Sequence, residues 1–137
     1  MLRAALSVLT LSLTSVPAFA AASQAGPDSD KAFNGAPTYR VYCGSCHGKE
    51  AKGDGPLAKD LRVQPANLTE LSMRNDGAFP FEMVIETINH GRSVRAHGSQ
   101  DMPAWGDAFE MTEQSEAAAK AKMEELAHFL WSLQKKP

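Results

Sequence analysis

Two cysteines and a histidine stand together in the sequence Cys43-Gly-Ser-Cys46-His47. Thiols three residues apart lie on one face of a helical turn, and an imidazole follows directly after the second thiol. This C-x-x-C-H spacing is the signature of covalent c-type haem attachment, in which the thiols form thioethers and the imidazole binds the iron. The sequence therefore predicts one haem c, held by Cys43 and Cys46, with His47 as an axial ligand.

Two other chemistries use the same residue types. A thiol redox motif is expected near a βαβ unit, and no convincing strand is visible in this sequence. A structural zinc ion needs four tetrahedral ligands, which two cysteines and an adjacent histidine cannot supply, and the chain has no third cysteine. Both are weaker interpretations than haem attachment.

The sixth ligand of a haem iron must come from elsewhere in the chain. Met102 is the favoured candidate, because it lies in a loop and Pro103 restricts the backbone after it. His97, in the same loop, is the alternative, since loops commonly carry binding residues on a rigid scaffold. The other methionines and histidines lack a rigid loop setting or occupy helical patterns, where methionine is usually core filler; they are Met73, Met83, Met111, Met123, His90 and His128.

Filling both axial positions with protein side chains leaves no open coordination site. Such an iron can change oxidation state but does not readily bind a substrate, which favours electron transfer over catalysis. The sequence thus predicts a one-electron carrier and not an enzyme. A haem protein with a displaceable sixth ligand that binds small molecules is the alternative.

Helical periodicity predicts an all-α domain of three to five helices with long loops. The clearest middle helix covers 80–90, where Phe81, Val84, Ile85 and Ile88 form one stripe. The other expected helical ranges are 35–46, with Pro37 in the first turn, a short piece at 57–61, a short helix capped by Asn67 or Thr69, and 112–134, capped by Thr112.

The first 20 residues have the outline of a secretory signal peptide. Arg3 precedes a short apolar run, and Ala18-Phe19-Ala20 fits a small-x-small cleavage site. Three segments are therefore expected: a signal peptide at 1–20, a flexible leader at 21–31 and a cytochrome c domain at 32–137. The exported product is expected in the periplasm, without a transmembrane span after cleavage.

The composition of the exported part raises the question of what fills its core. Only 18 of the 117 residues after Ala20 are Leu, Ile, Val or Phe. A haem would add a large apolar plate whose burial removes apolar area from water. We therefore expect the haem-free chain to be largely unfolded. The net charge of −2 gives no basic stripe of the kind that binds nucleic acid.

The C-x-x-C-H motif and several other short motifs together make the sequence resemble monohaem class I c-type cytochromes of the bacterial periplasm. The resemblance covers roughly residues 33 to 135. Besides the C-x-x-C-H motif, it rests on Gly53-Asp54-Gly55-Pro56, Pro65-Ala66-Asn67-Leu68-Thr69, His97-Gly98 and Met102-Pro103-Ala104-Trp105-Gly106.

The resemblance implies a small fold wrapped around one haem, with His47 as proximal and Met102 as distal ligand. It also implies that the first and last helices cross at Gly35, with Tyr39 against Phe129 or Trp131. A backbone carbonyl in a Gly-Pro turn would accept the other ring N–H of His47, with Pro56 as first candidate and Pro65 as alternative. Trp105 would lie near a haem propionate or pack against the haem edge.

The implied partners are redox proteins: a dehydrogenase, a membrane cytochrome complex or a terminal oxidase or reductase. The chain would act as a monomer or in transient complexes. It could equally be the haem subunit of a dehydrogenase or oxidase complex.

Overall fold

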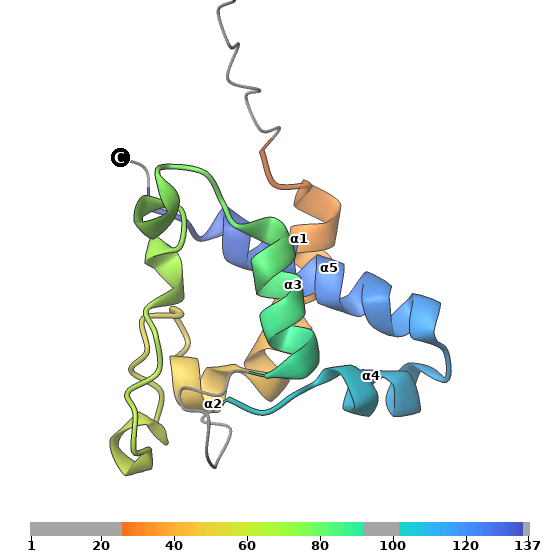
Figure 1. Ribbon diagram of the computed structural model, residues 1–137, viewed down its shortest axis with the longest axis horizontal. Coiled ribbons are helices and arrows are strands. Elements are labelled where there is room, and N and C mark those ends of the chain that lie inside the picture. Colours follow the sequence, from red (N-terminus) through yellow and green to blue (C-terminus); the bar gives the residue numbers. More distant parts are fainter. Residues whose placement is uncertain (1–25, 92–101, 136–137) are drawn as a thin grey trace, which may run out of the picture.

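The computed structural model describes residues 26–91 and 102–135. Within these ranges the chain is helical and contains no strand, as expected for an all-α cytochrome c fold (Figure 1). The α-helices are α1 (Ser29–Tyr42), α2 (Gly44–His47), α3 (Phe81–His90), α4 (Gly106–Glu113) and α5 (Glu116–Ser132). Three single turns of 3-10 helix are η1 (Ala58–Asp60), η2 (Leu68–Glu70) and η3 (Met73–Asn75). The predicted signal peptide and His97 lie outside the described residues.

Helix α1 begins earlier than the sequence suggested. It starts at Ser29 and not at Gly35, so it enters the segment expected to be a flexible leader. Asp28 caps it, with its carboxylate accepting from two backbone N–H groups of the first turn. Pro37 therefore lies inside the helix and not in its first turn.

The first and last helices form the centre of the fold, as Figure 1 shows where α5 crosses α1. Gly35 permits the crossing, because a Cβ at this position would lie 2.2 Å from the backbone oxygen of Glu125. Tyr39 is fully buried there, and its ring centroid lies 5.1 Å from that of Phe129. The predicted crossing at Gly35 is confirmed, and Phe129 is the aromatic partner of Tyr39.

Replacing Gly35 by alanine is therefore expected to destabilise the protein by about 2–3 kcal/mol, since the new methyl group meets rigid backbone. Chemical denaturation of the purified protein measures this loss. Gly44→Ala is the matched control, because its Cβ would meet only the backbone oxygen of Tyr39 at 3.7 Å. Equal stabilities of the two variants would contradict the close approach.

The C-terminal helical region is two helices where one was expected over 112–134. Gln114 adopts a left-handed conformation, φ 59°, and ends α4, and the Ser115 side chain caps α5. Thr112 therefore lies within α4 and is not the cap. Helix α5 buries Ala119, Met123, Leu126 and Leu130 in the core.

The segment between α2 and α3 runs along one side of the molecule (Figure 1, yellow to green) and is fastened to the end of α5. The Gln134 side chain donates to the carbonyl of Leu68 at 2.8 Å and accepts from the backbone N–H of Ser72 at 2.9 Å. Asn67 caps η2, as one of the two predicted candidates. In the described ranges, no helix has the length and hydropathy needed to cross a membrane.

Candidate haem-attachment site

The two cysteines and the histidine of the C-x-x-C-H motif lie on one helical turn. Cys43 ends α1, and its carbonyl accepts from the backbone N–H groups of Cys46 at 3.2 Å and His47 at 2.9 Å. Both thiols are free and partly buried. The turn therefore presents two thiols and one imidazole from adjacent positions, which is the arrangement that the sequence predicted.

The imidazole of His47 is oriented by one backbone carbonyl. Its Nδ1 donates to the oxygen of Ala66 at 3.1 Å, so the proton resides on Nδ1 and the lone pair on Nε2. Burial lowers the pKa of His47, while the bond to Ala66 opposes this shift. A neutral imidazole with a free Nε2 lone pair is the form that binds a metal.

The acceptor is the carbonyl of Ala66, so the prediction that Pro56 or Pro65 would supply it was wrong. Two contacts bring this carbonyl to the histidine. The first is the close packing of Gly53 on Pro65, where a Cβ on Gly53 would lie 2.2 Å from the carbonyl oxygen of Pro65. The second is a hydrogen bond from the backbone N–H of Leu68 to the carbonyl of Ala51 at 2.8 Å. The signal in the sequence was the motif that begins at Pro65, but which of its carbonyls faces His47 depends on these long-range contacts.

The environment of the thiols does not match a thiol redox site. Burial raises the pKa of the Cys43 thiol to about 12, and Cys46 adds to this effect. Reactive cysteines in redox motifs have a lowered pKa, because the thiolate is the nucleophile. Among the described residues no group of three or more His, Cys, Asp or Glu side chains could hold a metal ion.

The backbone after Met102 is fixed against the end of α3. Trp105 donates its backbone N–H to the carbonyl of Ile88 at 2.9 Å. Gly91, with φ 71°, packs so closely that a Cβ would lie 2.6 Å from the carbonyl oxygen of Met102. Met102 itself is partly buried against the hydrophobic core.

Aromatic contacts connect this segment to the attachment turn. Tyr42, the residue before Cys43, packs its ring 5.2 Å from that of Trp105 and 5.1 Å from that of Phe109. Trp105 thus packs on the chain itself, and its place near a propionate stays a prediction. Met102 and Cys43 both border the same core cluster, so the structure brings the predicted ligand segment toward the predicted attachment segment.

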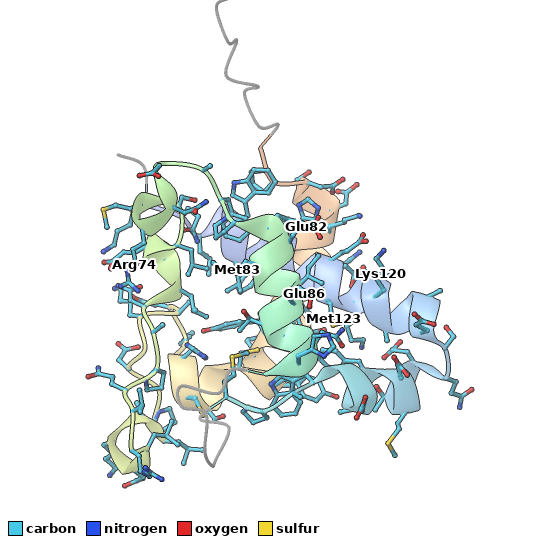
Figure 2. The ribbon with its side chains drawn as sticks, in the orientation of Figure 1. Arg74, Glu82, Met83, Glu86, Lys120 and Met123 are labelled. Carbon is cyan, nitrogen blue, oxygen red and sulfur yellow. The ribbon has the colours of Figure 1, made fainter. Side chains whose placement is uncertain are left out.

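The remaining methionines have settings less suited to iron ligation. Figure 2 shows Met83 on α3 and Met123 on α5. Met123 is buried in the core as predicted, whereas Met83 is 54% exposed, so the expectation that it fills the core was wrong. Met73 and Met111 are also exposed.

One family model matches the chain over residues 30–121, and its description is "Cytochrome C oxidase, cbb3-type, subunit III". The chain belongs to this family. It is therefore a monohaem c-type cytochrome whose cytochrome c domain implies haem c and haem-based electron transfer. A comparison with curated proteins gives no match.

Proposed function

We propose that this cytochrome is a one-electron carrier whose haem c is held by thioethers to Cys43 and Cys46, with His47 and Met102 as axial ligands. The observation that carries the proposal is the attachment turn: both thiols and a neutral imidazole lie on one turn, and Nδ1 of His47 is already bonded to Ala66. That bond fixes the ring and raises its basicity as a ligand. When bound, the haem supplies exchange between ferrous and ferric iron.

The donor set and its surroundings fit this group. Partly buried apolar side chains border the same core cluster as Cys43 and offer surface that a macrocycle would cover; they are Leu68, Leu71, Ile85 and Met102. Haem binding would bury these side chains further and so increase the buried apolar area of a chain that has few large apolar residues.

The proposed role of Met102 is to close the second axial position. A thioether is a soft ligand, and methionine ligation raises the reduction potential of haem. Backbone contacts with Ile88 and Gly91 hold the segment from Met102 to Trp105 beside the end of α3. These contacts would restrict where the sulfur of Met102 can lie. With His47 and Met102 both bound to the iron, the site would favour electron exchange with redox proteins over substrate chemistry.

We further propose that the chain is exported to the periplasm after cleavage near Ala20. The basic, apolar and small-x-small order of its first 20 residues supports this. There it would exchange electrons with a dehydrogenase, a membrane cytochrome complex or an oxidase or reductase. The family description, which names an oxidase subunit, favours one alternative: a haem subunit docked on an oxidase.

A pyridine haemochrome assay combined with intact mass spectrometry tests the proposal. The exported protein is expected to give a c-type spectrum and the mass of residues 21–137 plus one haem. Replacing both cysteines by serine should remove the covalent haem, and Ser45→Ala in the same turn should not. Purified wild-type protein without covalent haem would refute the proposal, and co-purification with oxidase subunits would favour the docked alternative.

A further inference from the structure

The hydroxyl of Tyr39 makes a contact that the crossing of α1 and α5 does not require. The ring is fully buried against Phe129, and a phenylalanine would fill the same space. The hydroxyl nevertheless donates to the backbone oxygen of Gly48 at 2.8 Å. It thus joins the helix crossing to the residue that directly follows His47.

Gly48 is the point where the chain leaves the attachment turn. Its N–H donates to the carbonyl of Gly44 at 3.0 Å, and its carbonyl also accepts from the N–H of Ala51 at 3.2 Å. Its φ of 84° lies in the region that favours glycine. A side chain there would meet Asp54, since a Cβ would lie 2.1 Å from a carboxylate oxygen.

The backbone of His47 is therefore fixed on its C-terminal side by few contacts. Its own carbonyl accepts from the N–H of Gly53 at 2.8 Å, and the next carbonyl, that of Gly48, accepts from Tyr39 and Ala51. Of these contacts, only the one from Tyr39 comes from a helix of the core. The others come from the same loop and would move with it.

We propose that Tyr39 is a positioning residue for the axial histidine: its hydroxyl holds the Gly48 peptide so that the ring of His47 keeps its orientation toward Ala66. This inference rests on the proposed function, because the orientation matters only when His47 is an iron ligand. It assigns to a core tyrosine a role in setting the geometry of the ligand. Burial raises the pKa of Tyr39 well above its ordinary value, so the hydroxyl remains a donor at physiological pH.

The test compares Tyr39→Phe with Tyr42→Phe in the ferric holoprotein. Both variants remove one hydroxyl from the same end of α1, and the hydroxyl of Tyr42 has no hydrogen-bond partner among the described residues. The hyperfine-shifted NMR resonances of the haem methyl groups report the orientation of the axial imidazole. Tyr39→Phe is expected to change their pattern, and Tyr42→Phe to leave it as in the wild type.

Amide hydrogen exchange of the holoprotein gives a second readout, which does not depend on the haem methyl resonances. Exchange at Ala51 and Gly53 is expected to be about three- to tenfold faster in Tyr39→Phe, the factor that loss of one typical hydrogen bond produces in a local opening equilibrium. Phe129→Leu separates packing from positioning: it should lower Tm while leaving the methyl pattern unchanged.

The outcomes distinguish this inference from the proposed function. Unchanged methyl shifts and unchanged exchange in Tyr39→Phe would overturn the positioning role while leaving haem binding intact. A wild-type protein without covalent haem would refute the proposed function, and the ligand-positioning role would fall with it, whatever the exchange rates show. A methyl pattern altered as strongly by Phe129→Leu would reassign the effect to packing and overturn the inference.

Discussion

Replacing Met102 by alanine is expected to remove the far-red charge-transfer band of the ferric protein and to lower its reduction potential. The band reports a thioether on the iron, and the thioether raises the potential by favouring ferrous iron. We expect a fall on the order of 0.1 V, part of the roughly 0.8 V over which axial ligands tune haem potentials. Absorption spectra and a redox titration measure both changes.

The same variant should gain affinity for added imidazole or cyanide, because the sixth position loses its protein ligand. Met111→Ala is the matched control: this side chain is 81% exposed on α4, and its loss should leave the spectrum unchanged. Met83→Ala tests the half-exposed methionine of α3. Loss of the band in Met83→Ala, with the band kept in Met102→Ala, would show that the wrong residue was named.

His97 requires its own comparison, because it was the alternative ligand and lies outside the described residues. If it were the ligand, the wild type would lack the thioether band, and His97→Ala would alter the spectrum. A wild type with the band and a His97→Ala variant like it would remove this alternative.

The attachment turn could be predicted in full because its information is local. Thiols three residues apart and a following histidine meet on any helical turn, and α2 provides that turn. The helix at 80–90 could also be predicted from the sequence, because its apolar residues recur at helical spacing and Gly91 ends it with φ 71°.

The start of α1 was harder to predict because distant contacts override a local signal. A proline inside a helix costs about 3 kcal/mol, so Pro37 suggested a helix start nearby. The actual start is supported by Asp28, whose backbone N–H donates to His128 at 3.0 Å, and by Lys31, which pairs with Glu124 at 2.8 Å. Both partners lie on α5, almost a hundred positions away in the sequence.

The break between α4 and α5 and the acceptor of His47 were missed for different reasons. Gln114 takes a left-handed conformation that sequence rules assign to glycine or asparagine. Ala66 carries no side-chain signal, because its carbonyl is the functional group. The close approach of Gly53 to Pro65 and the hydrogen bond from Leu68 to Ala51 place that carbonyl beside the ring.

Replacing His47 by alanine is expected to have the largest effect of all, the loss of stable holoprotein. The imidazole is the ligand proposed to be fixed beside both thioethers, and no other histidine lies on the attachment turn. Without it, haem would lack its strong proximal ligand. Covalent haem per polypeptide, measured by the pyridine haemochrome, should fall at least about tenfold, since even outer-shell partners of metal ligands cost 10–100-fold.

A second consequence should follow for the chain itself, because few large aliphatic side chains are available to fill the core. The haem-free His47→Ala protein is expected to melt without a cooperative transition and to be degraded in cells, since burial of the haem's apolar surface is lost. His90→Ala is the control: its side chain is 69% exposed at the end of α3, so haem content and melting should match the wild type. A His47→Ala protein with wild-type haem content and a low-spin spectrum would show that another residue binds the iron. A compact, cooperatively melting haem-free form would show instead that the side-chain core around Tyr39, Phe79 and Leu126 suffices for folding.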